Sequence, residues 1–292
     1  MIAIQGISPA FILSARLRYD MAPIPVTFEA QIRLTSETAL LIQDGELIRV
    51  NEIPMRIIKC EPLRNAGGGV QGDLPLSAVS ITAFPDALVG VARRRRAAVI
   101  FKNASFSSIY RACGATVGVD GDMSIERFAC FKGDVPTMQI AKVLQEESAV
   151  LIWKAGRVAV VRLRELLAQP PVASLTVTAS EDVQSDFLEA DEIPQYVSTG
   201  PDGKFVIGER RHEAQAVVYT PRKSVRALGL MGRVLVRRKV ITGQPNLEVQ
   251  AGAVLNVRGV PMAVITAVHH MQNGTDGGDI AQYSRFWLGS LS

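Results

Sequence analysis

Residues 131–167, FKGDVPTMQIAKVLQEESAVLIWKAGRVAVVRLRELL, constrain the fold most, because the spacing of the apolar residues changes within this stretch. The spacing is first that of an amphipathic helix. The apolar face carries Ile140, Ala141, Val143 and Leu144. Asp134 and Pro136 are typical of a helix start, and the pattern predicts a helix that ends near Ser148.

From residue 151 onward the pattern becomes that of strands. The apolar runs 151–154 and 157–161 are separated only by Ala155 and Gly156, a two-residue loop in which glycine can adopt a positive φ. This predicts a tight β-hairpin that packs on the apolar face of the preceding helix.

A shorter helix is predicted at residues 105–113. Ser105 is a suitable N-cap, and Gly114 is a suitable C-terminal stop. The apolar side chains between them follow the spacing i, i+3, i+4, i+7: Phe106, Ile109, Tyr110 and Cys113.

Strand patterns dominate both flanks of this helical segment. Residues 26–34 alternate between apolar and polar side chains, which is typical of a half-buried antiparallel strand. The other predicted strands before the helices are 47–50, 55–60 and 76–84. After a junction at 170–204, strands are predicted at 214–219, 232–240, 247–250, 254–257, 262–269 and 282–288.

The predicted fold class is therefore mainly β with an α+β insert. Two β-barrel-like domains, residues 1–98 and 171–292, would flank a helix–hairpin domain at 99–170.

The segment 103–167 resembles a recurring segment of phage tail baseplate hub proteins, related to the hub half of type VI secretion spike proteins. The resemblance rests on a helix that ends in Glu146-Glu147-Ser148, followed by an apolar strand, a glycine turn and a second strand. The runs 250–257, 261–270 and 283–288 are similar to the closing strands of a hub barrel.

The resemblance implies a structural protein of the virion, made in the host cytoplasm. Three copies would form a ring that adapts a hexameric tail tube to a trimeric central spike. The implied partners are the tail tube or a tube-initiator protein, the spike and other baseplate proteins, with DNA only as passing cargo. The family pattern implies neither catalytic residues nor a cofactor.

Arg93, Arg94, Arg95 and Arg96 form the densest charge in the chain. A short run of like charges is commonly a solvated loop. The alternative is an interface or channel-lining role, because a ring of subunits would gather these cations around its axis, facing acidic partners or DNA.

The overall composition agrees with an assembled protein. A mean hydropathy of +0.18 is high for a chain whose apolar runs are far shorter than the roughly 20 residues of a membrane helix. We therefore expect subunit contacts to bury apolar surface, and no membrane span. The N-terminal residues 1–20 lack the pattern of a signal peptide.

Patterns for metals, phosphate or redox chemistry are weak. The glycine-rich loop 65–73 lacks the ending of a phosphate-binding loop, and Asp120 and Asp122 lack the further ligands of a calcium loop. The cysteine and histidine positions match no zinc or redox motif, and we expect structural roles for them: Cys60, Cys113, Cys130, His212, His269 and His270.

Two alternatives to a structural hub remain open at this point. One is a hydrolase that uses Asp134, Glu146 or Glu147 with a histidine. The other is a nucleic-acid-binding protein that uses the arginine run, although no aromatic stacking strand or recognition helix accompanies it.

Overall fold

The computed structural model describes residues 2–35, 38–63, 70–71, 74–75, 77–175, 180–182, 193–200, 202–209, 216–274 and 279–291. The predicted glycine-rich loop at 65–73 lies mostly outside these residues, as does His212. The predicted strands 76–84 and 214–219 lie partly outside them.

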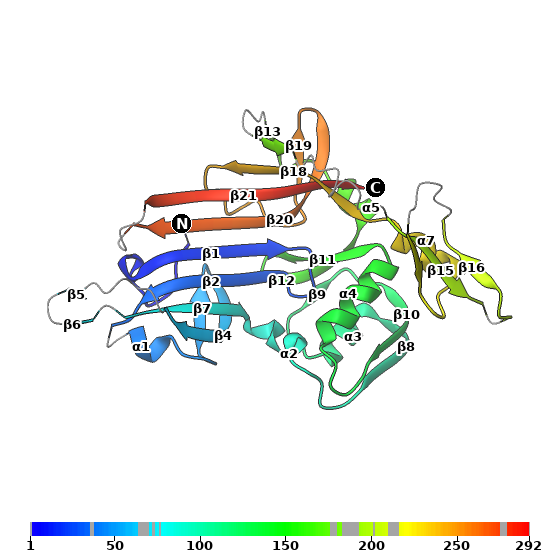
Figure 1. Cartoon of the computed structure of the whole chain (residues 1–292), viewed down its shortest axis with the longest axis horizontal. Helices are drawn as coiled ribbons and strands as arrows, with labels where there is room; N and C mark the ends of the chain where they lie inside the picture. Colours follow the sequence, from blue (N-terminus) through cyan, green and yellow to red (C-terminus); the bar gives the residue numbers. More distant parts are fainter. Residues whose placement is uncertain are drawn as a thin grey trace.

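One sheet of 11 strands forms the body of the molecule (Figure 1). Its N-terminal strands are β1 (Ile12–Asp20), β2 (Val26–Arg33), β3 (Leu47–Val50), β4 (Ile53–Pro62) and β7 (Ala78–Pro85). Its C-terminal strands are β13 (Ala173–Leu175), β14 (Ser180–Asp182), β18 (Leu235–Gly243), β19 (Val254–Val257), β20 (Val260–Asn273) and β21 (Ile280–Leu291). The main path is β14-β18-β21-β20-β1-β2-β7-β4-β3, with β13 and β19 attached beside β20.

The N-terminal and C-terminal strand groups meet at the pairing of β1 with β20. These strands are antiparallel, and Leu17 lies opposite His269. The predicted class, mainly β with an α+β insert, is confirmed, and no strand pairing that closes a barrel occurs among the described strands. The two strand groups share one sheet, and the domain boundaries at 98 and 170 stay predictions.

The strand β2 illustrates why these segments fold as they do. Its alternate side chains Val26, Phe28 and Ile32 are fully buried, while Glu29 between them is exposed. This alternation, predicted from the sequence, places one face of the strand on the core.

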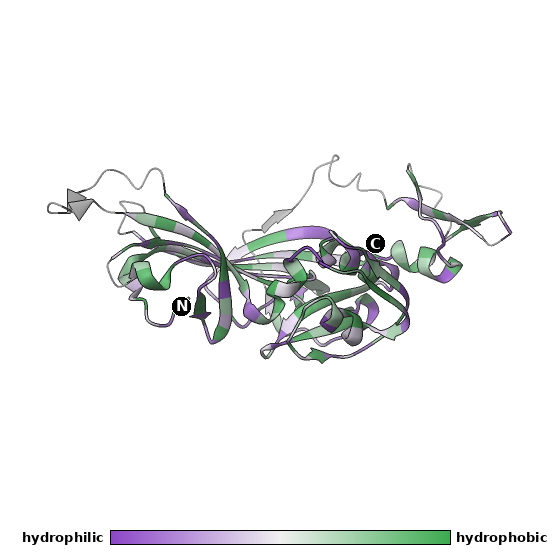
Figure 2. Ribbon diagram, turned by 90° about the horizontal axis from the view of Figure 1, so that it is seen from below, coloured by the Kyte–Doolittle hydropathy of each residue, from purple (hydrophilic) through white to green (hydrophobic). Residues whose placement is uncertain are grey.

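A helix–hairpin region packs beside the sheet and shares its hydrophobic core, and hydrophobic positions lie on both (Figure 2). Its elements are β8 (Val99–Ser105), α3 (Phe106–Ala112), β9 (Val119–Asp120), β10 (Ser124–Cys130), α4 (Pro136–Glu146), β11 (Ala149–Lys154), β12 (Arg157–Arg162) and α5 (Leu163–Leu167). Tyr110 on α3 is fully buried, and its hydroxyl donates a 2.7 Å hydrogen bond to the carbonyl of Pro23, between β1 and β2.

The predicted hairpin and short helix are confirmed. Ala155 and Gly156 join β11 to β12 with φ angles of 48° and 76°, as a two-residue turn requires. Ser105 caps α3 by accepting a hydrogen bond from the amide of Ser108.

Two details of the predicted longer helix were wrong. Val135 occupies the N-cap of α4, because the carboxylate of Asp134 instead accepts a 2.9 Å hydrogen bond from the amide of Phe131. Ala141 is exposed, whereas Ile140 and Leu144 are buried as predicted.

The remaining short elements surround the sheet. They are the 3-10 helices η1 (Pro9–Phe11) and η2 (Asp86–Leu88), the helices α1 (Thr38–Leu41) and α2 (Val89–Ala92), and the strands β5 (Val70–Gln71) and β6 (Leu74–Pro75). The predicted strand at 247–250 is a turn, because the side chain of Asn246 accepts a hydrogen bond from the amide of Glu248 and bends the chain.

A small unit, here called the arm, projects from one end of the molecule (Figure 1). It comprises the described residues between 193 and 231. Its elements are β15 (Gln195–Thr199), β16 (Phe205–Ile207), β17 (Val217–Tyr219) and α7 (Val225–Met231). The three strands form a separate sheet in the order β16-β15-β17. The sequence patterns predicted only β17 among these elements.

Candidate functional site

The four arginines follow α2 and precede β8, and the structure divides them. Arg93, Arg94 and Arg96 are exposed, whereas Arg95 is half-buried. Among the described residues, none of the ion pairs includes Arg93, Arg94 or Arg96. These three guanidinium groups therefore face solvent, and we call them the arginine surface.

Arg95 connects its loop to the helix–hairpin region. Its amide donates to the carbonyl of Asp134, and its own carbonyl accepts from the amide of Gly133, both at 2.9 Å. Its guanidinium donates a 3.3 Å hydrogen bond to the carbonyl of Cys113, at the C-terminal end of α3. A cation at this position also complements the helix dipole. Arg95 is thus a structural residue.

Two glycines fix the position of the loop. A Cβ atom on Gly90 of α2 would lie 2.3 Å from the carbonyl oxygen of Gly114, just after α3. No larger residue fits where these two backbones cross. The close contact fixes α2, which immediately precedes the arginine surface, against the end of α3.

A second concentration of charge lies between α4 and the arm, and we call it the clamp. Its centre is Glu147, whose carboxylate accepts hydrogen bonds of 2.8 and 3.1 Å from the guanidinium of Arg226 on α7. Arg162 on β12 contacts the same carboxylate at 3.3 Å. The adjacent Glu146 pairs with Lys223 at 2.5 Å.

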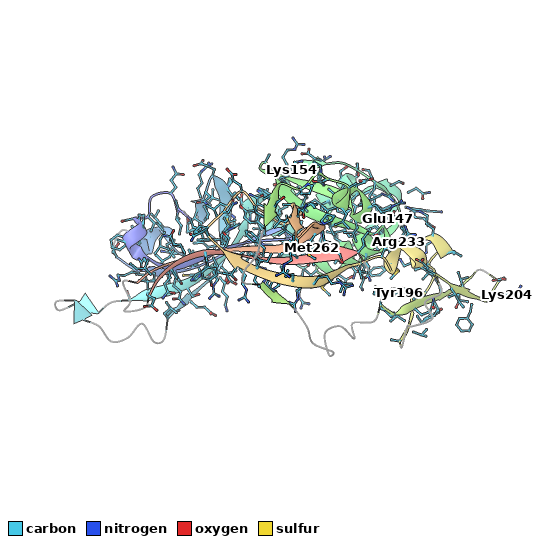
Figure 3. All side chains as sticks on the ribbon, turned by 90° about the horizontal axis from the view of Figure 1, so that it is seen from above. Glu147, Lys154, Tyr196, Lys204, Arg233 and Met262 are labelled. Atoms are coloured by element: carbon cyan, nitrogen blue, oxygen red, sulfur yellow. The ribbon has the colours of Figure 1, made fainter. Side chains whose placement is uncertain are left out.

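Neutral side chains extend the clamp on both sides. The Gln145 amide donates a 2.9 Å hydrogen bond to the hydroxyl of Tyr196 on β15. The Ser148 hydroxyl donates a 3.1 Å hydrogen bond to the carbonyl of Arg233, just beyond α7. Four consecutive residues at the end of α4 therefore hold the arm and the segment after it, and Glu147, Tyr196 and Arg233 lie together in Figure 3.

A cavity of about 620 Å³ lies beside the clamp. Its walls come from β10, α4 and the arm, including Arg127, Val143, Val206 and Arg222. Because acidic and basic side chains both line it, the cavity has no single sign of charge that would select a ligand.

Several solved structures share this fold, although no family model and no curated protein matches the chain. A tail protein from Neisseria meningitidis superposes with a TM-score of 0.66 at 9% identity, covering 99% of this chain and 96% of that one. The 43 kDa tail protein of prophage MuSo2 from Shewanella oneidensis gives 0.63 at 10% identity, covering 98% and 97%. An Escherichia coli component of the type VI secretion system gives 0.57 at 10% identity, covering 99% and 76%.

The chain has the fold of phage tail proteins. The E. coli protein is itself described as structurally similar to the T4 bacteriophage tail proteins gp27 and gp5. The neighbours thus agree with the fold expected from the sequence resemblance.

Within this tail-protein fold, the acidic residues considered for hydrolysis have other partners. Glu146 and Glu147 bind cationic side chains in the clamp, and Asp134 binds the backbone. Among the described residues, no hydrogen bond or ion pair joins any of these three to a histidine.

The two described histidines lie on β20 inside the sheet. Nδ1 of His269 is 2.8 Å from the Ser284 hydroxyl, and the ring packs edge-on against Tyr19 and Phe286. Burial lowers the pKa of His269 to about 4, so it is neutral at pH 7. Burial also lowers the pKa of His270.

The aspartates considered for calcium serve local structure. Asp120 pairs with Arg157 at 2.8 Å, and Asp122 accepts hydrogen bonds from the amide and the hydroxyl of Ser107 at the start of α3. No group of three or more possible metal-ligating side chains occurs among the described residues, and the three cysteines are free thiols. No helix within the described ranges is long and apolar enough to span a bilayer.

Proposed function

We propose that this chain is a structural hub in the tail or baseplate of a bacteriophage or phage-like particle. The observation that carries the proposal is the agreement in fold with tail proteins over almost the full length of both chains. The proposed role is structural rather than catalytic, and the particle is its proposed location after synthesis in the host cytoplasm.

The proposed assembly is a trimeric ring that adapts the hexameric tail tube to the trimeric central spike. The pairing of β1 with β20 supports it, because each chain places an N-terminal and a C-terminal strand group side by side in one sheet. Three copies would present six strand groups to the tube while keeping threefold symmetry for the spike. Other baseplate proteins would bind the outside of this ring.

The arginine surface is proposed to serve this assembly as an interface or a channel lining. Its three exposed cations per chain would be repeated around the ring axis, where acidic partner surfaces or DNA in passage would offset their mutual repulsion. The proposal leaves out Arg95, because its internal hydrogen bonds hold it against the helix–hairpin region. DNA is passing cargo in this proposal.

Cryo-electron microscopy of purified particles tests the proposed position. We expect three copies of the chain between the tube and the spike. A location outside the tail, or a twofold dimer in the assembled particle, would contradict the proposal.

Charge reversal tests the arginine surface. Changing Arg94 and Arg96 to Glu should leave the melting temperature nearly unchanged, since exposed charges contribute about 0–1 kcal/mol to folding, but should reduce incorporation into particles. The matched control changes Arg237 and Arg238, two neighbouring exposed residues of β18, to Glu. Equal incorporation of both variants would show that the arginine surface is a solvated loop with no role in assembly.

A further inference from the structure

The register of the arm sheet assigns its side chains to two faces. β15 pairs antiparallel with β16 and parallel with β17, and residues directly opposite each other in such pairs lie on the same face. Val197 lies opposite both Ile207 and Tyr219. The face that contains these residues, here called the outer face, also carries Gln195, Thr199, Phe205 and Val217.

The opposite face is covered by the rest of the molecule. Ser198 is fully buried and accepts a hydrogen bond from the amide of Lys223, and Tyr196 binds Gln145 of α4. Gly208 lies so close to Leu228 of α7 that an added Cβ would be 2.8 Å away. This face is covered around Ser198 and Tyr196, although Val218 on it is 40% exposed, so the outer face offers the larger free surface for docking.

The outer face is apolar and exposed. Phe205 on β16 is 77% exposed, and Val217 and Tyr219 on β17 are 67% and 53% exposed. Contiguous exposed apolar groups of this kind mark interaction surfaces.

A second group of exposed apolar side chains lies on α1, toward the other end of the molecule (Figure 1), and on the start of β3. It consists of Leu40, Leu41 and Leu47, which are 73%, 46% and 53% exposed. We call these three residues the end patch. The outer face and the end patch lie on opposite ends of the long axis, so one chain cannot cover its own patch.

The charges beside the two surfaces are complementary. Lys204 precedes Phe205 at the tip of the arm (Figure 3), and its side chain is 85% exposed, with only a well-exposed contact of 3.6 Å to Asp202. Asp44 and Glu46 are exposed in the turn that precedes Leu47, and none of the ion pairs of the described residues uses them. Opposite charges at the rim of an apolar contact favour one orientation.

We propose that the outer face of the arm docks on the end patch of a second copy of this chain. The contact joins two different surfaces, so it is heterologous, and repetition around an axis closes a ring. This second proposal rests on the proposed ring. It adds that the outer face and the end patch are the surfaces that hold neighbouring copies together. The clamp would then transmit this contact to α4 of the same chain.

Site-directed cross-linking tests the contact in assembled particles and in the purified full chain. Phe205→Cys and Leu47→Cys are placed in separate copies on a Cys60→Ser background, and a bifunctional maleimide reagent is added. We expect a cross-linked dimer only when both copies are present. The matched control replaces Leu47→Cys with Ile280→Cys, which is even more exposed at 78% and should not cross-link to Phe205→Cys.

A charge exchange provides a second readout. Lys204→Glu and Glu46→Lys should each reduce the cross-linked fraction severalfold, and the two changes combined should restore it. Failure of the combination to restore cross-linking would overturn the proposed orientation.

The two proposals fail in different ways. A tail that contains three copies but no link between positions 205 and 47, or a link from position 205 to another tail protein, overturns this contact and leaves the hub in place. Absence of the chain from purified particles would overturn the proposal that it is a tail hub.

Discussion

The helix–hairpin region and the arm are stabilised in different ways. Ile140 and Leu144 of α4 belong to the same hydrophobic core as the large sheet, together with Phe106 and Tyr110 of α3. No described residue of the arm belongs to that core. The arm instead depends on the polar contacts of the clamp and on the buried Leu228 and Met231 of α7.

This difference has a consequence for stability. Salt does not screen apolar burial, whereas it screens ion pairs between partly exposed groups. We therefore expect the helix–hairpin region to unfold with the body and the arm to open separately at a lower free energy.

Leu144→Ala should have the largest effect. Its side chain is 4% exposed, so truncation should lower the free energy of unfolding by about 2–5 kcal/mol. Chemical denaturation measures this loss. Met138→Ala on the same helix is the control, since Met138 is 63% exposed and should change little. Equal effects would mean that α4 does not belong to the shared core.

Glu147→Gln should have the second largest effect, and it should be local. The change removes the charge that binds Arg226 and Arg162, and hydrogen bonds to charged groups contribute about 1.5–3 kcal/mol. Hydrogen exchange should speed up in β15, β16, β17 and α7 of the arm and stay unchanged in β11 and β12.

Glu61→Gln is the matched control for the clamp, because the pair of Glu61 with Lys59 is well exposed on both sides. Its exchange pattern should equal that of the unmodified chain. Uniform acceleration throughout the body in Glu147→Gln would show that the arm is not a separate unit.

The helix caps give a smaller and more direct test. Ser105 and Ser224 each accept a hydrogen bond from the amide three residues later, and loss of an N-cap costs about 0.5–2 kcal/mol. Ser105→Ala should lower the global free energy of unfolding, whereas Ser224→Ala should raise exchange only within α7 and the arm strands. A global loss in both variants would remove the distinction between the two regions.

Asp122→Asn should have the smallest effect, and it depends on pH. Partial burial opposes ionisation of Asp122, but hydrogen bonds from Ser107 and Met123 outweigh burial and lower its pKa below 3.8. The unfolded chain therefore binds this proton first, so the stabilisation is complete above pH 4 and is lost as the pH falls through the folded pKa. Denaturation at pH 7 and pH 3 should show a larger difference between the variant and the original chain at the higher pH.

Much of the helix–hairpin region follows from local sequence signals. Ser105, the apolar spacing after it, and the Ala155-Gly156 turn each act over a few residues, which is why the sequence predicted α3, β11 and β12. The arm carries fewer such signals, although Ser224 caps α7 as Ser105 caps α3. Its helix α7 is short and contains Gly229, and its strands β15 and β16 carry neither a long apolar run nor a clear alternation.

The candidate site shows the same limit. The sequence indicates the charge of the arginine run, but the separation of Arg95 from its neighbours depends on Cys113 and Asp134, which are distant in sequence. Two partners of Glu146 and Glu147, Lys223 and Arg226, likewise come from the arm, about 80 residues later in sequence than α4. Contacts of this kind are set by tertiary structure, and single-sequence patterns do not contain them.

The junction of β1 with β20 has a consequence for biosynthesis. β1 leaves the ribosome early, and its partner strand follows about 250 residues later, which at about 5–20 residues per second is a delay of roughly ten to fifty seconds. During that time one edge of β1 has no native partner, and an open strand edge is a template for pairing with other chains. Nascent copies emerging from neighbouring ribosomes on one message would therefore be the most prone to mispair, and a chaperone that covers the first hundred residues would protect the yield of this protein.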